Sequence, residues 1–198
     1  AVKAVLEQAA IDQVQRDAVF LFGARDIWFV VGVPIFFYDK LSWSFTEVGS
    51  FMASWIIFYG IIQSLAPKLL KIFYGNNFSE NEQAFIWAIK LLLIIACLGI
   101  LSYTYDYNGY LICMGLFLFG FIFAINSSIH SYLILALAKK NDVTLDVGFY
   151  YMANAIGRLL GCIISGFSYQ IAGLIGCFFF AGIFLFFCSV FSFYLKSY

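Results

Sequence analysis

Residues 148–170 read GFYYMANAIGRLLGCIISGFSYQ, an apolar stretch long enough to cross a membrane. Residues four apart in sequence lie on the same face of a helix. In this stretch one such face carries only small side chains, at Ala153, Gly157, Gly161 and Ser165. A second helix backbone can pack closely in a groove of this kind, as helices in membranes often do. The stretch is therefore predicted to be a packed helix of a transmembrane bundle.

A second face of the same helix carries Asn154 and, one turn later, Arg158. A charge near the bilayer centre costs at least about 2.5–3.5 kcal/mol, so we expect Arg158 to face a bundle interior or a water-filled cavity. Its planar guanidinium suits carboxylate or phosphate oxygens. Arg158 is therefore the first candidate for an anion-binding residue.

The composition indicates an integral membrane protein whose first partner is the lipid bilayer. Hydrophobic residues make up 64% of the 198 residues and charged residues 11%, whereas soluble domains are roughly half apolar and one quarter charged. The apolar runs lack the alternation of a membrane β-barrel, so they are predicted to be helices. The formal net charge is zero, which gives no basic surface for nucleic acid.

Six apolar segments reach the roughly 20 residues that a helix needs to cross the bilayer. They are predicted at residues 18–38, 44–66, 84–103, 110–138, 148–170 and 171–194. Ser44 and Glu47 have the spacing of a capping box at the start of the second span, and Pro67 is expected to end it. Residues 1–17 are too polar to span and are predicted to be an amphipathic helix on the cytoplasmic membrane surface. The fold class is thus an all-α membrane protein, with the six-helix bundle at residues 18–198.

The basic residues of the connections predict the orientation of the bundle. Short cytoplasmic segments carry an excess of lysine and arginine. If both ends of the chain are cytoplasmic, Lys40 is the basic residue left outside. The basic residues then inside are Lys3, Arg16, Lys68, Lys71, Lys139, Lys140 and Lys196.

Two further ionisable residues, Arg25 and Asp26, lie within the first span. Counted along the helices, Arg25 and Arg158 are at similar depths from the cytoplasmic edge. Arg25 either binds an anion or forms an internal ion pair. Asp26 either carries a proton or has a structural role, and the structural role is favoured.

Four residues are candidates for gating and packing. Pro34 lacks a backbone donor and is expected to kink the outer half of the first span, with Gly32 as the flexible point. Gly157 and Gly161 are expected to admit a neighbouring backbone.

The fourth span holds a polar cluster that includes Asn126, Ser127 and His130. These side chains either line a substrate path or hydrogen-bond between helices. For His130 a structural role is favoured, because the sequence offers no second histidine, cysteine or suitably spaced acid for a metal site. No metal or cofactor is predicted. No G-x-S-x-G turn or acidic pair at catalytic spacing occurs, so the chain is not expected to be an enzyme.

Six spans, a broken first helix and a glycine-rich fifth helix resemble the C-terminal half of a twelve-helix major facilitator superfamily transporter. Three blocks are similar to the organoarsenical efflux permeases of bacterial arsenic-resistance operons. They are FLFGARDIWFVVGVP at residues 20–34, FAINSSIHSYLI at 123–134 and LDVGFYYMANAIGRLLG at 145–161. The connection between the second and third spans departs from the superfamily pattern, because it lacks the glycine-aspartate-arginine signature.

The resemblance implies export of 1-arseno-3-phosphoglycerate across a bacterial inner membrane by alternating access, and hence arsenate resistance. This compound forms when glyceraldehyde-3-phosphate dehydrogenase accepts arsenate, so that enzyme is the implied functional partner. Arg25 and Arg158 are implied to hold the anionic ends of the substrate. The groups implied to hydrogen-bond its middle are Asn126, Ser127, His130 and Asn154. Facilitator cavities lie between two halves, so an N-terminal six-helix half of the same polypeptide is expected to complete the site.

Two alternatives stay open at this point. The first keeps the carrier fold but changes the substrate to another phosphorylated metabolite or a drug. The second is of another class, a free-standing six-helix membrane assembly or structural protein.

Overall fold

The computed structural model describes residues 2–75, 79–104, 108–138 and 143–195, and the side chains from residue 7 onward. Within these ranges the regular elements are all helical, which confirms the predicted fold class. They are α1 (Val2–Ile27), the π-helix η1 (Trp28–Gly32), α2 (Val33–Asp39), α3 (Phe45–Tyr74), α4 (Glu80–Thr104), α5 (Gly109–Leu137) and α6 (Val143–Leu195). Lys139, Lys140 and Lys196, which contribute to the predicted orientation, lie outside the described residues.

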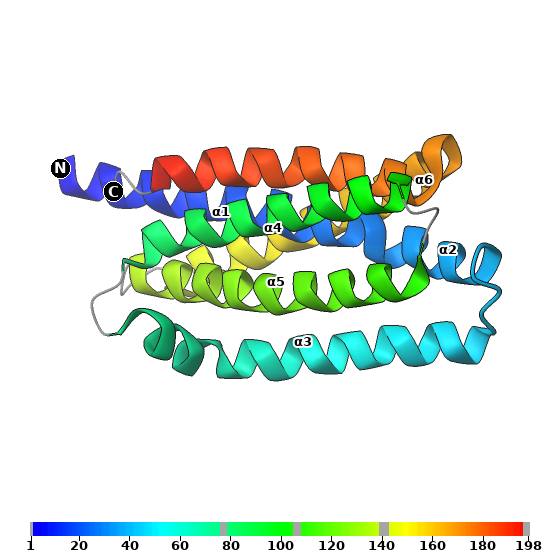
Figure 1. Ribbon diagram of the computed structural model, residues 1–198. Helices are drawn as coiled ribbons and strands as arrows, with labels where there is room; N and C mark the ends of the chain where they lie inside the picture. The colour runs from blue at the N-terminus through cyan, green and yellow to red at the C-terminus, as the bar shows by residue number, and fades with distance from the viewer. Residues whose placement is uncertain (1, 76–78, 105–107, 139–142, 196–198) are drawn as a thin grey trace.

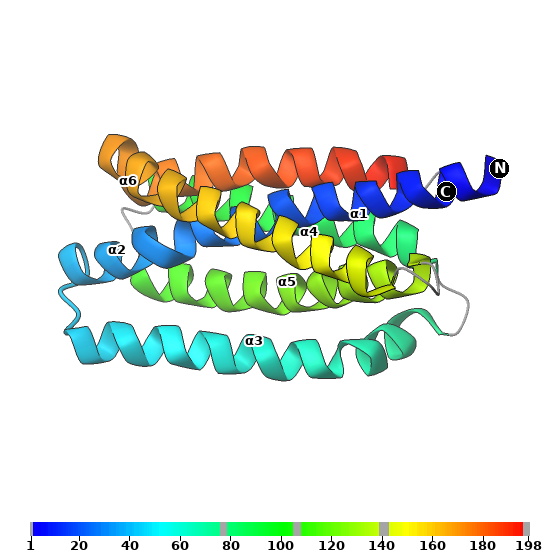
Figure 2. The ribbon, with the colours of Figure 1, turned by 180° about the vertical axis from the view of Figure 1, so that it is seen from behind.

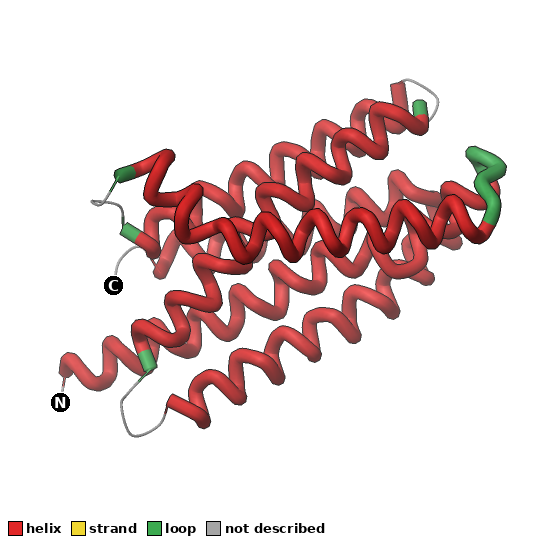
Figure 3. The backbone as a smooth tube through the Cα atoms, turned by 90° about the horizontal axis from the view of Figure 1, so that it is seen from below, coloured by secondary structure: helices red, strands yellow, loops and turns green. Residues whose placement is uncertain are grey.

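The helices lie side by side along one long axis (Figures 1 and 3). α1 packs along α6, and α4 lies against both α5 and α6. α3 contacts α5 at the edge of the bundle, as Figures 1 and 2 both show. The start of α1 and the end of α6 lie at the same end of the bundle (Figure 1).

α6 contains a break that divides it into two arms. Ala172 (φ −142°, ψ 20°) and Gly173 (φ 61°, ψ −149°) leave the helical conformation. The angles of Gly173 belong to a region that is open essentially only to glycine. The second arm turns back along the bundle (Figures 1 and 2). At 1.5 Å per residue even the shorter arm, residues 174–195, is about 33 Å long.

The described chain has five helices that are long and apolar enough to cross a membrane, when α6 is counted as one. Because the break splits α6 into two arms of spanning length, these five helices supply six crossing segments. The structure therefore has one helix fewer than the six that the sequence predicts, because the fifth and sixth predicted spans are the two arms of α6.

The first span is a single bent rod made of α1, η1 and α2. Pro34 lies in the first turn of α2 and has no N–H to donate. Its ring also crowds the carbonyl one turn earlier. The π-helical turn Trp28–Gly32 stands directly before it, where a local widening of the helix relieves this clash. The distortion expected at Pro34 is thus a π-bulge on its N-terminal side.

Residues 2–17 belong to this same rod, whereas the sequence predicts a separate surface helix at 1–17. α1 runs without a break from Val2 to Ile27. Ile11 and Val14 are fully buried, and the amide of Gln13 donates to the carbonyl of Phe191 at 3.0 Å. The apolar side of this segment therefore packs against the second arm of α6.

The ends of α3 show one correct and one wrong expectation. Ser44 and Glu47 form the predicted capping box, with the Ser44 N–H donating to the Glu47 carboxylate at 2.7 Å. Pro67 does not end the helix, which continues to Tyr74 and stops at Gly75 with φ 73°. Proline is tolerated inside long membrane helices because neighbouring groups and local adjustments satisfy the freed carbonyl.

Aromatic rings fill the space between α1, α3 and α5. The Trp28 ring meets those of Trp55 and Phe119 edge-on, at centroid distances of 5.6 and 5.1 Å. The indole N–H of Trp55 donates to the Leu116 carbonyl at 2.8 Å. This contact fixes α3 to the face of α5 that carries the polar cluster of the fourth span.

Candidate functional site

The small-residue face of α6 receives the backbone of α1. A Cβ added at Gly157 would lie 2.2 Å from the carbonyl oxygen of Val19, and one added at Gly161 would lie 2.6 Å from that of Gly23. One turn further on, the hydroxyl of Ser165 accepts a hydrogen bond from the Gly32 N–H at 3.2 Å. The absence of side chains at Gly157 and Gly161 therefore brings the two helices into backbone contact.

This close contact brings three charged side chains together. Arg25 Nε donates to Asp26 Oδ1 at 2.6 Å, within α1. Arg158 Nε donates from α6 to Asp26 Oδ2 at 3.0 Å. Neighbouring residues on a helix diverge by about 100°, but the long arginine side chain of Arg25 spans that angle. Asp26 thus holds both arginines of the sequence prediction, one through each carboxylate oxygen.

The cluster of Arg25, Asp26 and Arg158 has an excess of one positive charge and is open on one side. The Asp26 side chain is 1% exposed and that of Arg25 12%, while that of Arg158 is 58% exposed. Across the described residues, Arg158 makes its hydrogen bond through Nε, which leaves its two terminal amino groups available. An anion reaching this face would meet the Arg158 guanidinium first.

α5 contacts the cluster of Arg25, Asp26 and Arg158 through an aromatic ring. The Phe123 ring lies 5.4 Å from the Arg25 guanidinium carbon, a cation–π distance. Ser127, one turn along α5, is fully buried and lies 3.2 Å from the hydroxyl of Tyr59 on α3. Tyr59 is a polar residue of this region that the sequence prediction missed, and its spacing in α3 gives no signal for it.

The two asparagines of the predicted site differ in their exposure. Asn154 lies half-exposed on α6, one turn before Arg158 on the same face. Asn126 is fully buried, and neither its amide oxygen nor its amide nitrogen has a hydrogen-bond partner among the described residues. An unpartnered buried amide is costly, so Asn126 is a polar group available to a ligand or to water.

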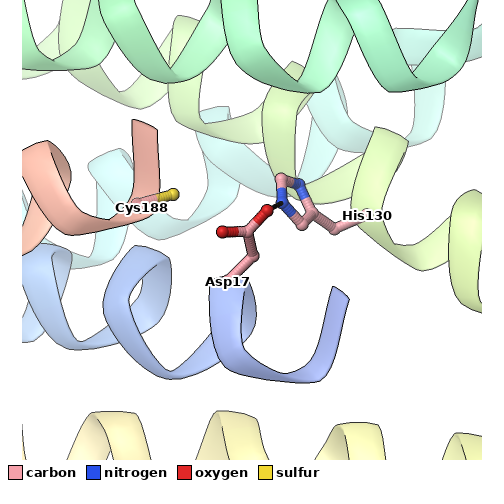
Figure 4. Close-up of side chains that lie close together, drawn as sticks. All are labelled: Asp17, His130 and Cys188. Atoms are coloured by element: carbon pink, nitrogen blue, oxygen red, sulfur yellow. Dashed lines mark hydrogen bonds and ion pairs between the residues drawn. The ribbon is translucent and has the colours of Figure 1, made fainter. Parts of the chain in front are cut away.

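His130 faces away from the arginine cluster. Its Nδ1 lies 2.9 Å from the backbone carbonyl oxygen of Asn126. Its Nε2 lies 3.4 Å from Asp17 Oδ2 (Figure 4). Cys188 of the second arm of α6 points into the same space (Figure 4). The sequence indicates no acid or cysteine beside His130, so the structure corrects that expectation. Asp17 was missed because its polar neighbours in sequence place it in the predicted surface helix.

The third intramembrane cation, Lys90, lies elsewhere. Its Nζ is 3.9 Å from the centre of the Trp87 ring and 3.3 Å from the hydroxyl of Tyr74. Lys90 therefore belongs to a local contact between α3 and α4, separate from the cluster on α1 and α6.

Fold and site together define a multi-pass membrane protein with a partly open cationic cluster between two closely packed helices. The family model described as Major Facilitator Superfamily matches residues 18–197. The chain therefore belongs to the Major Facilitator Superfamily, whose members are membrane transporters. No curated protein and no solved structure matches the chain.

Proposed function

We propose that this chain is part of a carrier that exports an anionic organoarsenical, 1-arseno-3-phosphoglycerate, by alternating access. The observation that carries the proposal is the cluster in which Arg25 and Arg158 share the single carboxylate of Asp26. Two guanidinium groups and one carboxylate leave one positive charge within the bundle. The substrate carries several negative charges on a phosphate and an arsenate, which match the planar donor geometry of arginine.

Binding at this cluster amounts to an exchange of partners. Guanidinium groups only donate hydrogen bonds, so an incoming oxyanion competes with Asp26 for the same two arginines. Arg158 is the more exposed of the two and is expected to engage the substrate first. Asn154 and the unpartnered amide of Asn126 are available to hydrogen-bond its uncharged middle. We expect release of Arg158 from Asp26 to loosen α6 from α1, which links binding to helix movement.

The three sequence blocks that resemble organoarsenical permeases support the choice of substrate. On this proposal the carrier resides in a bacterial inner membrane with both ends of this segment cytoplasmic. A second six-helix half of the same polypeptide completes the cavity. Glyceraldehyde-3-phosphate dehydrogenase supplies the substrate on the cytoplasmic side.

Arsenate resistance of cells that express the complete carrier and the dehydrogenase tests the proposal. Arg158→Gln and Arg25→Gln each remove a charged donor, which typically weakens binding of an anion by about 1.5–3 kcal/mol, or roughly 10- to 150-fold. We therefore expect both variants to restore arsenate sensitivity at unchanged protein level. Lys90→Gln is the matched control, because Lys90 is also an intramembrane cation but contacts Trp87 and Tyr74.

Wild-type resistance in both arginine variants would remove the cluster from the substrate site. Resistance that does not depend on the dehydrogenase would instead favour the other carrier candidate, a transporter of another phosphorylated metabolite or drug. Membership of a transporter family already argues against the alternative of an assembly or structural protein.

A further inference from the structure

A second group of ionisable side chains lies outside the arginine cluster, where α1, α5 and the second arm of α6 meet. Asp17 and His130 are both 0% exposed, with His130 Nε2 3.4 Å from Asp17 Oδ2. The hydroxyl of Ser192 donates to the same Asp17 oxygen at 2.7 Å. Figure 4 shows the carboxylate and the imidazole facing each other across the space between α1 and α5. Asp17 belongs to the candidate span Glu7–Asp39.

The hydrogen bonds determine how many protons this pair can hold. His130 Nδ1 lies 2.9 Å from the Asn126 carbonyl oxygen, which can only accept, so Nδ1 carries a hydrogen. Nε2 and Asp17 Oδ2 then share one proton, either as imidazolium and carboxylate or as imidazole and carboxylic acid. Without that proton, a lone pair and a negative charge would face each other in a dry interior, which is unfavourable.

The surroundings leave this proton without a competing charge. The groups that face Asp17 are His130 from α5 and Cys188 and Ser192 from α6. Within the described ranges no lysine or arginine pairs with Asp17. Its second oxygen, Oδ1, is buried and has no hydrogen-bond partner in the part of the chain that the structure describes. The charge of the pair therefore depends on the proton alone.

We propose that Asp17 and His130 form a proton-binding site that couples transport to proton movement. This inference rests on the proposed carrier function and supplies its coupling ion. The proton is bound between His130 Nε2 and Asp17 Oδ2 and leaves to water as H⁺, so the pair changes from neutral to singly negative. Ser192 is a positioning residue, because it fixes the oxygen that faces the imidazole.

The alternative carrier of the proton, Asp26, is engaged differently. Each of its oxygens accepts from a guanidinium group, and a guanidinium stays charged at all physiological pH values. A proton on Asp26 would have to displace an arginine. The sequence candidate for proton coupling is therefore replaced by a pair of residues from α1 and α5. Its aspartate, Asp17, lies nine residues before Asp26 on α1, about 14 Å along the helix axis.

A metal ion is the other ligand that an aspartate, a histidine and a cysteine suggest. The three ligand atoms lie within 4.8 Å of one another, whereas ligand atoms of a tetrahedral zinc site are separated by about 3.5 Å. Asp17 Oδ2 also already accepts from Ser192. A proton needs only these two partners, and a small approach of Nε2 and Oδ2 from 3.4 Å brings them to ordinary hydrogen-bond distance.

The site is closed in this conformation, and α1 connects it to the arginine cluster. Both side chains are fully buried, so proton exchange requires α1 to separate from α5 or α6. Arg25 and Asp26 lie on the same helix as Asp17. A shift of α1 that frees Arg158 from Asp26 therefore also changes the contact between Asp17 and His130.

Infrared difference spectra of the purified complete carrier, recorded between about pH 5 and pH 9, test the proton site without a substrate. We expect a pH-dependent carboxyl and imidazole signal in the wild type that is lost in Asp17→Asn and also in His130→Gln. Ser189→Ala is the matched control, because its hydroxyl lies on the same arm but donates to the Leu185 carbonyl. No pH-dependent signal in the wild type, or one that survives in Asp17→Asn, would overturn the proposal even if His130→Gln failed to fold.

Proteoliposomes with a pH indicator inside test the coupling. Arsenate, glyceraldehyde 3-phosphate, NAD⁺ and the dehydrogenase are supplied outside, at the face that is cytoplasmic in cells. Hydrolysis of the acyl arsenate in the lumen releases protons in every variant, so the lumenal pH is compared at equal uptake of labelled substrate. We expect the wild type, which moves H⁺ outward, to leave the lumen more alkaline than Asp17→Asn does. The same pH change per substrate moved in both proteins refutes the coupling but leaves the proposed function intact. If the wild type moves no arsenical, the proposed function fails, and the infrared result alone decides the proton site.

Discussion

The contact between Gly157 and Val19 gives the sharpest test of the packing between α1 and α6. In Gly157→Ala the new Cβ would lie 2.2 Å from the Val19 carbonyl oxygen and 2.8 Å from its Cα. Both neighbours are backbone atoms, so no side-chain rotation relieves the overlap. Restoring ordinary contact distances requires the helices to separate by about 1 Å. Because Arg158 is adjacent, its 3.0 Å bond to Asp26 lengthens as well.

The expected magnitude follows from a comparison with a second glycine of the same arm. Added methyl groups in packed interiors cost about 1–3 kcal/mol, whereas alanine is favoured over glycine in a helix by roughly 0.5–1 kcal/mol. Apart from its own helix turn, no described residue has an atom within 4 Å of a Cβ added at Gly166. Gly166→Ala therefore gains only the helix preference, and the two variants should differ by the packing cost of about 1–3 kcal/mol.

Thermal unfolding of the complete carrier in detergent, followed by the fraction that stays monodisperse, measures this difference. For a unit of this size each kcal/mol shifts the midpoint by about 2–4 °C. We expect Gly157→Ala to unfold below the wild type and Gly166→Ala to unfold at or above it. Equal midpoints for the two variants would show that α1 and α6 do not meet at Gly157.

Two further predictions concern gating and the aromatic core. Gly32→Leu should depress transport without preventing membrane insertion, because its Cβ would lie 2.8 Å from Cys177 Sγ; unchanged substrate flux in vesicles would argue against gating at the π-bulge. Trp55→Phe should lower stability by about 0.5–1.5 kcal/mol through loss of its bond to Leu116. Trp28→Phe removes the same ring volume from a buried site, but its N–H has no partner among the described residues. Its loss in the same thermal assay should therefore be smaller by the cost of that hydrogen bond. Equal losses would contradict this reasoning.

Much of the fold follows from local sequence signals. Apolar length gives the spans, and the capping box gives the start of α3. The boundary predicted between residues 170 and 171 lies close to the break at Ala172 and Gly173, although this apolar run has neither a proline nor a charge there. Pro67 predicts a helix end that the structure does not have, since a long membrane helix keeps most of its hydrogen bonds when one donor is missing.

The candidate site could be predicted only in part from the sequence. Arg158 is recognisable because it is a lone charge in an apolar helix, and the groove beside it predicts a close neighbour. Sequence does not show that the neighbour is α1, because that pairing depends on the tertiary packing of helices more than 100 residues apart. Asp17 was hidden by its polar neighbours, although Val14 and Leu21 lie on the same buried stripe at helical spacing.

The first span, made of α1, η1 and α2, carries the groups that relate the two sites to the packing of α6. Along its length Asp17 meets Ser192, Asp26 meets Arg158, and the N–H of Gly32 meets Ser165. The partner in the first contact is on the second arm of α6, and the other two partners are on the first arm. The two arms are joined through the break at Ala172 and Gly173 and by the hydrogen bonds of Cys177 with Ser168 and Ser165 beside it. A rotation of one arm relative to the other cannot preserve all three contacts with the first span. Anion binding at the arginine cluster and proton binding at Asp17 are therefore expected to influence the same movement of the first span relative to α6.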